Sequence, residues 1–211
     1  MGERLRILQV TPWSVHGDGT GGMAAVVRDL SAALREAGHH VENLAGAWNA
    51  PKPIREGEEV RLRLPGSPSR RSPFQRLKGL LHRERAARAL LALCRRNAID
   101  VMHAHYAAPY LTTLARARAL GGPPYLVTCH GGDVVAVPNL HQDQRQAVTS
   151  AMHAATARVA VSRWLADEAE TVFALDFALD RVETVPNGFN IPWTRVPDRG
   201  SVESALERPL P

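Results

Sequence analysis

Residues 126–134, with the sequence LVTCHGGDV, pass from an apolar run directly into a histidine, two glycines and an aspartate. The apolar run has the composition of a buried strand, and the polar residues fall where that strand would end. At such a place His130 can donate a proton to a leaving group or stabilise developing charge, and the alternative is a histidine packed in the core. Gly131 would let a ligand come close to the backbone, with Asp133 beside it.

A second cluster of glycines follows the predicted strand Arg6–Val10. Gly21 and Gly22 stand directly before a segment with apolar residues at helical spacing, so backbone N–H groups at the start of that helix could bind a phosphate. The alternative is a turn without a ligand. The run GDGTGG does not predict a dinucleotide site, because its last two glycines adjoin the helix and no acidic strand end follows at the expected distance. A Walker loop is excluded, because the chain has no G-K-[ST] sequence.

The sequence gives little support for a disulfide, a metal site, or a cysteine or serine hydrolase. Cys94 and Cys129 have the spacing of neither a zinc site nor a disulfide framework and are expected to be buried free thiols. Cys129 cannot use His130 as its base, because neighbouring residues in a strand face opposite sides, and no G-x-S-x-G elbow supports a serine hydrolase. His103 and His105 share a strand face but lack a third ligand at a suitable spacing, so we predict no metal and no cofactor. We expect His105 to face a cleft and His103 to pack beneath it.

The elements that must position these residues alternate along the chain. The predicted strands are 6–10, 40–46, 58–64, 99–105, 125–132, 158–162 and 182–188, and the predicted helices are 23–38, 74–97, 109–120, 142–156 and 163–175. In the strand 58–64, apolar residues alternate with charged ones, which is typical of an edge or half-exposed strand. Strands that alternate with helices predict an α/β fold: a single Rossmann-like parallel sheet with helices on both faces. The domain would cover residues 1–190, and the proline-containing residues 191–211 would form a tail or an interdomain linker.

In an open parallel sheet, ligands bind at the carboxyl ends of the strands. The unusual polar and glycine residues follow predicted strands, so we expect them to gather on one rim of the sheet as half of a pocket. These residues are Gly21, Gly22, His105, His130, Gly131, Asp133, Arg163, Asn187 and Gly188.

The formal net charge of +5 comes from one part of the chain. The segment 61–96 holds a cluster of Lys and Arg residues with Glu84 as its one acid. Phe74 is the one aromatic residue there, so the base-stacking pattern of a nucleic-acid site is missing and we predict no nucleic-acid partner. No apolar run reaches the roughly 18 residues of a membrane span, and no secretory signal is predicted. The expected location is cytoplasmic.

Five ordered motifs resemble the amino-terminal domain of family 4 glycosyltransferases, which are retaining enzymes of the GT-B fold. They are GGMAAVVRDLSAALREAGHHV, IDVMHAHYA, LVTCHGGDV, VAVSRWLADEA and VPNGFN, and the resemblance as a whole covers about residues 6–190. The resemblance implies that Gly21 and Gly22 contact the donor diphosphate or its sugar. It places His130 beside the transferred sugar, where it supports developing charge.

The same resemblance implies that Asp133 and Arg163 line the cleft, and that Asn187 and Gly188 lie at the crossover to a second domain. The glutamate pair that marks the donor-binding domain of the family, with seven residues between the two, is not found. The resemblance therefore implies a glycosyltransferase that moves a sugar from a nucleotide-diphosphate donor to a hydroxyl acceptor with retention, with a separate chain supplying the donor-binding half.

The alternative is a catalytically silent module that docks a partner enzyme or a membrane. That module would dock through the basic segment Arg61–Arg96. In a glycosyltransferase the same segment would be an acceptor-side surface or a surface that faces the inner side of the membrane, and the alternative in either case is a solvated helix face. The sheet rim that meets the second domain in the family is expected to expose an apolar patch, and hence to favour self-association or a partner.

Overall fold

The structure is a computed structural model of the 211-residue chain. It describes residues 3–16, 22–47, 50–65, 73–175 and 182–187, without the side chains of residues 73–76.

The centre of the described chain is a sheet in the order β3-β4-β2-β1-β5-β6-β7-β8. Every neighbouring pair is parallel except β3 and β4, which are antiparallel. The strands are β1 (Arg6–Thr11), β2 (His40–Gly46), β3 (Ile54–Glu56), β4 (Glu59–Leu62), β5 (Val101–His105), β6 (Tyr125–Cys129), β7 (Ala157–Ala160) and β8 (Val182–Thr184). The parallel strands end at one rim, as the alternation of strands and helices predicts.

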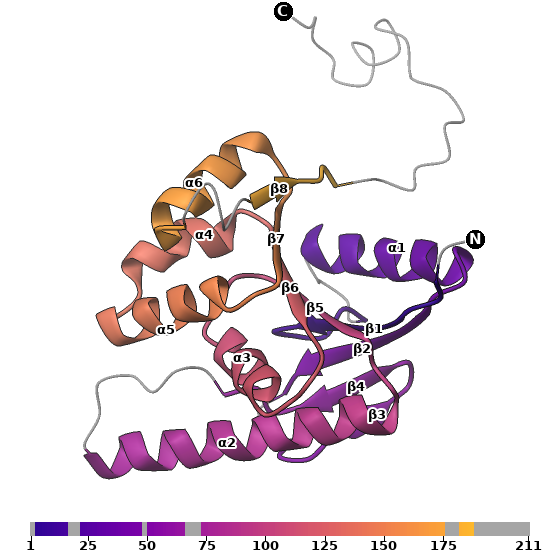
Figure 1. Cartoon of the computed structure of the whole chain (residues 1–211), viewed down its shortest axis with the longest axis horizontal. Coiled ribbons are helices and arrows are strands. Elements are labelled where there is room, and N and C mark those ends of the chain that lie inside the picture. The colour runs from indigo at the N-terminus through magenta and orange to yellow at the C-terminus, as the bar shows by residue number, and fades with distance from the viewer. Residues whose placement is uncertain (1–2, 17–21, 48–49, 66–72, 176–181, 188–211) are drawn as a thin grey trace, which may run out of the picture.

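Helices cover both faces of this sheet, which confirms the predicted fold class. In Figure 1, α1 lies on one side of the sheet, and α2 and α3 lie on the other. The helices are α1 (Gly22–Glu36), α2 (Pro73–Arg96), α3 (Leu111–Ala119), α4 (Gly132–Ala136), α5 (Gln142–His153) and α6 (Arg163–Phe173), with a short 3₁₀ helix, η1 (Val137–Asn139).

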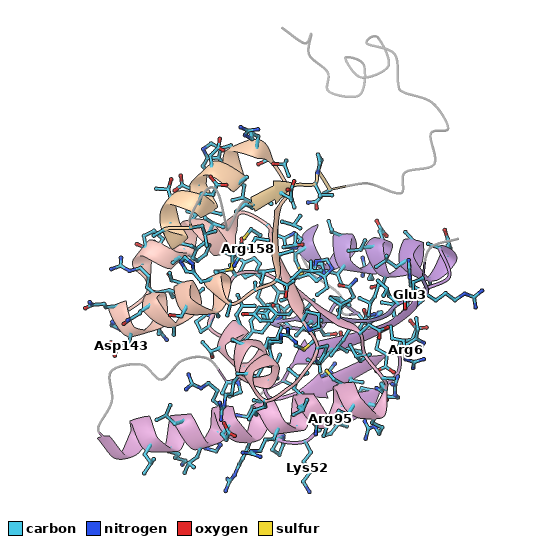
Figure 2. The ribbon with its side chains drawn as sticks, viewed as in Figure 1. Glu3, Arg6, Lys52, Arg95, Asp143 and Arg158 are labelled. Carbon is cyan, nitrogen blue, oxygen red and sulfur yellow. The ribbon has the colours of Figure 1, made fainter. Side chains whose placement is uncertain are left out.

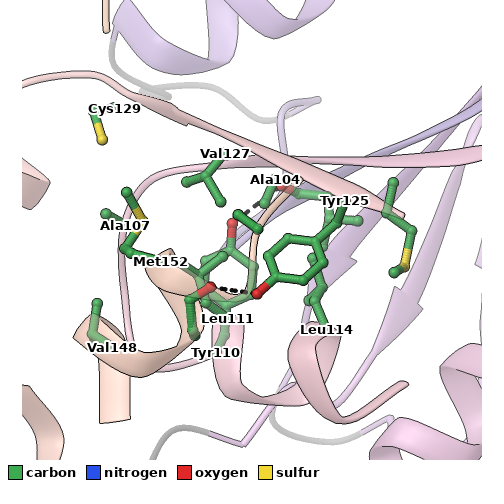
Figure 3. Close-up of a cluster of buried hydrophobic side chains, with 14 of the residues drawn as sticks. Ala104, Ala107, Tyr110, Leu111, Leu114, Tyr125, Val127, Cys129, Val148 and Met152 are labelled. Atoms are coloured by element: carbon green, nitrogen blue, oxygen red, sulfur yellow. Dashed lines mark hydrogen bonds between the residues drawn. The ribbon is translucent and has the colours of Figure 1, made fainter. Parts of the chain in front are cut away.

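The period-2 alternation of β6 separates the core from the functional face. Tyr125, Val127 and Cys129 are buried in the cluster that includes Leu114 of α3 and Met152 of α5 (Figure 3). The Tyr125 hydroxyl donates a hydrogen bond to the Ala151 carbonyl. Residues at the intervening positions of β6 face the opposite side, toward α1.

Arg158 ties β7 to the end of α5. Its guanidinium is buried and donates to the carbonyls of Met152, at 2.8 Å, and His153, at 2.6 Å. These carbonyls belong to the last turn of α5, beyond which the helix supplies no N–H groups four residues on. The Met152 carbonyl also accepts a hydrogen bond from the backbone N–H of Ala155, at 3.2 Å. Figure 2 shows Arg158 within the body of the protein, whereas Lys52 and Arg95 project outward.

The edge-strand interpretation of residues 58–64 was wrong. β4 lies between β2 and β3, and its Val60 and Leu62 side chains are buried. The edge is β3, which folds back on β4 through a turn at Gly57, with φ +60°. That positive φ is readily adopted by glycine and lets the preceding residues pair antiparallel. Helix α4 and η1 were not predicted, and residues 191–211 lie outside the described chain.

Candidate functional site

A cavity of about 600 Å³ lies between α1 and the sheet, beside the carboxyl ends of the central strands. The sheet contributes His103 and Thr128, and the rim contributes His130 and Asn187. Its lining also includes His105, Val159, Val185 and Pro186, with Val26, Asp29, Leu30, Ala32, Ala33 and Glu36 from α1. The polar groups around this space are imidazoles, an amide, the Thr128 hydroxyl and two carboxylates, which suit hydroxyl groups as hydrogen-bond partners.

Three histidines stand together on the α1 side of the sheet. The rings of His103 and His105 have centroids 4.1 Å apart, and those of His105 and His130 are 5.4 Å apart. His105 Nδ1 is 3.2 Å from His130 Nε2, and His105 Nε2 is 2.7 Å from Gln9 Oε1. His103 Nε2 is 2.7 Å from Thr128 Oγ1.

Burial keeps these imidazoles neutral. It lowers the pKa of His103 to about 3 and lowers the pKa of His105 well below its ordinary value, because the charged form loses its hydration. The pKa of His130 is also lowered by burial, although the charge of Asp133 acts in the opposite direction. At neutral pH the cluster therefore offers single N–H donors and ring lone pairs rather than positive charge.

The loop that carries His130 is held by the carboxylate of Asp133. This carboxylate accepts hydrogen bonds from the backbone N–H groups of Ala107, at 2.7 Å, and Gly131, at 2.8 Å. The N–H of His130 also donates to it, at 3.0 Å. Asp133 is 2 % exposed, and the contacts join the end of β5 to the end of β6.

Both glycines of the loop meet a local steric demand. Gly131 has φ +117°, which other residues rarely adopt. A Cβ on Gly132 would lie 2.9 Å from the hydroxyl of Tyr106. Tyr106 itself has φ +91°, and its ring meets that of Trp13 edge-on, with centroids 5.3 Å apart. Backbone strain of this kind at the ends of two adjacent strands is typical of functional loops.

The structure places the other predicted site residues as follows. Gly22 begins α1, with open space where a Cβ would stand. Arg163 begins α6 after the N-cap Ser162, and its exposed guanidinium contacts Asp167 at 3.3 Å. Asn187 lines the cavity. Gly21 and Gly188 lie outside the described residues.

Both β5 histidines line the cavity, so His105 faces it as expected, but His103 does not pack beneath it. His105 is the more buried of the two, at 1 % exposed, and His103 is only partly buried. The reason is Gln9, the buried polar residue of β1 that holds the His105 ring and that the sequence reasoning missed. A glutamine within the apolar run RILQV was the available signal, because a buried polar side chain needs a partner.

Neither a metal cluster nor a membrane span is found in the described parts of the chain. No group of three or more His, Cys, Asp or Glu residues there could hold a metal ion. No helix among those described is long and apolar enough to cross a bilayer.

An open parallel sheet with a cavity and polar loops at its carboxyl-end rim is typical of a Rossmann-like α/β domain that binds a ligand at that rim. Residues 20–192 match the family described as Glycosyltransferase Family 4. The chain belongs to this family. Among curated protein sequences, none matches the chain significantly.

Solved structures share the fold at low sequence identity. Sucrose-phosphate synthase from Thermosynechococcus elongatus has a TM-score of 0.63 and 19 % identity, over 97 % of this chain and 53 % of that protein. The N-terminal domain of Candida albicans trehalose-6-phosphate phosphatase has a TM-score of 0.57 and 12 % identity, over 96 % and 53 %. An α-glucosyltransferase bound to UDP and DNA has a TM-score of 0.55 and 10 % identity, over 89 % and 44 %. The chain thus spans about half the length of the proteins it resembles.

Proposed function

We propose that this chain is the acceptor-side half of a retaining glycosyltransferase, which transfers a sugar from a nucleotide-diphosphate donor to a hydroxyl acceptor. The observation that carries the proposal is the position of His130, at the strand rim and in the wall of the cavity. Membership of family 4 supports the reaction class, and one fold neighbour was solved with UDP. A separate chain would supply the donor-binding half.

The acceptor would occupy the cavity. Asp29 and Glu36 offer carboxylate oxygens that accept hydrogen bonds from hydroxyl groups, and Asn187 offers an amide. These carboxylates would repel a phosphate, so the donor diphosphate belongs outside the cavity, at the rim.

The donor diphosphate would lie at the N-termini of α1 and α6, where the helix dipole is positive. Backbone N–H groups at the start of α1, at Gly21 and Gly22, would stabilise the leaving group, and Arg163 would add a cation from the start of α6. His130 would stand beside the sugar. Asp133 would act by holding the loop, since its oxygens already accept three backbone N–H groups. Gly188, with Asn187, would lie at the crossover to the donor-binding half.

Replacing His130 tests the proposal. With UDP-, GDP- and ADP-sugars, candidate acceptors and a partner chain that contains the donor-binding half, we expect turnover by the natural protein. His130→Ala should lower it by about 10² or more, because a group beside the reacting centre is lost. His141→Ala, which removes an exposed histidine, should leave the rate unchanged.

The proposal would be contradicted if the chain behaved as a catalytically silent binding module. Calorimetry without heat for any of these donors, together with no turnover when partner chains are added, would favour the binding-module alternative.

We also propose that α2 rests on an anionic membrane surface, at the cytoplasmic face. Leu77, Leu81, Arg85 and Arg88 follow one another at spacings of four, four and three residues, and all four are exposed. The spacing puts them on one face of the helix. Exposed leucines among cations suit a surface of acyl chains and anionic headgroups.

A further inference from the structure

Gln9, His105 and His130 form a chain of hydrogen-bonding groups across three adjacent strands. Gln9 is in β1, His105 ends β5, and His130 follows β6. The first contact, Gln9 Oε1 to His105 Nε2, is 2.7 Å, and the second, His105 Nδ1 to His130 Nε2, is 3.2 Å. Gln9 is fully buried and His105 is 1 % exposed, so water does not replace either partner.

The Gln9 oxygen determines where His105 carries its proton. A neutral imidazole has one N–H and one lone pair, and burial holds the pKa of His105 well below its ordinary value. The Gln9 Oε1 atom only accepts hydrogen bonds. His105 Nε2 therefore carries the proton and donates it, which leaves Nδ1 as a lone pair.

We propose that Gln9 and His105 are positioning residues that fix the proton of His130 on its Nε2 atom. The lone pair of His105 Nδ1 requires a donor, and the atom facing it is His130 Nε2. A neutral His130 that donates from Nε2 has its own lone pair on Nδ1. This assignment rests on the hydrogen-bond geometry; its meaning for catalysis rests on the proposed function.

For sugar transfer, the assignment specifies what His130 offers. Nδ1 is left to accept a hydrogen bond from a substrate hydroxyl. Its lone pair is also the negative end of the ring dipole, which stabilises positive charge that develops on a sugar as its leaving group departs. His130 would then act on the sugar rather than on the diphosphate.

In the competing arrangement, each hydrogen bond of the chain from Gln9 to His130 runs in the opposite direction. The Gln9 Nε2 atom is buried and has no hydrogen-bond partner among the described residues. With its carboxamide turned over, Gln9 would donate to His105 Nε2, His105 would donate from Nδ1, and His130 would carry its proton on Nδ1. The two arrangements give His130 opposite tautomers.

Nitrogen NMR of the full chain distinguishes these tautomers. Long-range ¹H–¹⁵N correlation spectra of ¹⁵N-labelled protein, recorded slightly above neutral pH, report which ring nitrogen of each histidine is protonated. The His130 signals are assigned from their loss in His130→Gln. We expect protonated Nε2 atoms on both His105 and His130, and a protonated Nδ1 on His130 would overturn the proposal.

The variant Gln9→Met tests whether Gln9 sets this state. It removes the acceptor at similar volume, and the loss of one hydrogen bond should reduce the tautomer ratio of His130 by about fivefold. Thr128→Val is the matched control, because it removes a contact of His103 and leaves the chain through His105 intact. If Gln9→Met does not fold, His105→Phe removes the acceptor of His130 directly.

An unchanged His130 ratio in a folded Gln9→Met or His105→Phe protein would refute the positioning role. The spectra need no donor sugar and no turnover. Failure of this inference therefore leaves the proposed function standing, and a silent protein with the expected tautomers would refute only the function.

Discussion

At the level of single residues, the loop at His130 depends on one buried carboxylate. Asp133 joins three backbone N–H groups from the ends of β5 and β6. Hydrogen bonds to an ionised group contribute more than neutral ones, and a buried donor left without its partner adds a desolvation cost. The position of His130 is thus maintained by a residue that has little contact with solvent.

We predict that Asp133→Asn lowers the free energy of unfolding by about 2 kcal/mol. The amide keeps the shape but loses the charge and turns an N–H group toward backbone donors. Urea unfolding followed by circular dichroism measures the change. Asp167→Asn, at an exposed carboxylate paired with Arg163, is the control and should change stability by less than about 0.5 kcal/mol. Equal effects of the two variants would contradict the role given to Asp133.

The sequence predicts the type and place of these residues better than their partners. His130, Gly131 and Asp133 could be located because an apolar run ends in polar residues. The pairing of Gln9 with His105 could not, because the two are 96 residues apart and meet only when β1 and β5 become neighbours. Without that partner, the relative burial of His103 and His105 was predicted in the wrong order.

At the level of elements, α2 has a buried side and an exposed side along its length. Its buried side holds Ala87, Leu90 and Cys94 in the core. Glu84, the one acid of the basic segment, binds Arg116 of α3 at 2.6 Å and Arg88 at 2.8 Å. Lys78, Arg85, Arg95 and Arg96 of the same helix are exposed. The helix therefore has a side that packs in the fold and a side that a partner could contact.

We predict that the full chain binds vesicles containing anionic lipid and that the double variant Leu77→Ser and Leu81→Ser binds at least about tenfold more weakly. Two leucines that enter the interface contribute buried apolar area. Co-sedimentation with vesicles of phosphatidylglycerol and phosphatidylcholine gives the affinities. Ile54→Ser, at an exposed isoleucine of β3, is the control. Equal binding to purely zwitterionic vesicles, or no loss in the variant, would exclude this membrane surface.

Elements with strong periodicity were predicted closely, and those set by tertiary contacts were not. β2 has the predicted bounds, 40–46, and α2 lies within one residue of the predicted 74–97. The β3–β4 hairpin was not predicted, because β3 is only three residues long. Helix α4 has five residues and follows the N-cap Gly131, so it depends on the Asp133 contacts rather than on its own propensity.

At the level of the whole molecule, apolar side chains remain exposed on segments that follow the strand ends. Trp13 is 44 % exposed, Val135 54 %, Trp164 63 % and Val185 57 %. They follow β1, β6, β7 and β8, so they belong to the rim that carries His130. Exposed apolar side chains at this rim are what a surface for a partner there would require.

We predict that the chain self-associates at high concentration through this rim, and that Trp164→Gln with Val185→Thr weakens the association by about tenfold or more, because a large exposed tryptophan is a common binding anchor. Static light scattering measures the mass. The Leu77→Ser, Leu81→Ser variant of α2 should associate normally. A monomer at every concentration would count against an interface at the rim.

The buried histidines make the folded protein sensitive to acid. Their folded-state pKa values lie below the ordinary 6.5, so the unfolded chain takes up protons that the folded chain does not. The stability that this difference supplies is complete above pH 6.5 and is lost as the pH falls toward about 3, where His103 titrates in the folded state.

From about pH 7 to about pH 5, we predict a loss of about 2 kcal/mol in the free energy of unfolding from His103, and a further loss in the same direction from His105. Urea unfolding at a series of pH values measures it. His103→Gln should remove about 2 kcal/mol of this pH-dependent loss, because that titrating group is gone. The same slope in the variant and the natural protein would show that other groups cause the acid sensitivity.

The two cysteines lie in the packed interior, one in α2 and one in β6. Burial raises the pKa of Cys94 to about 12 and raises that of Cys129 as well. Alkylating reagents attack the thiolate, so neither sulfur reacts while the fold is closed. The alkylation rate of each thiol therefore reports how often the element around it unfolds locally. The ratio of the two rates would show whether α2 detaches before β6 or together with it.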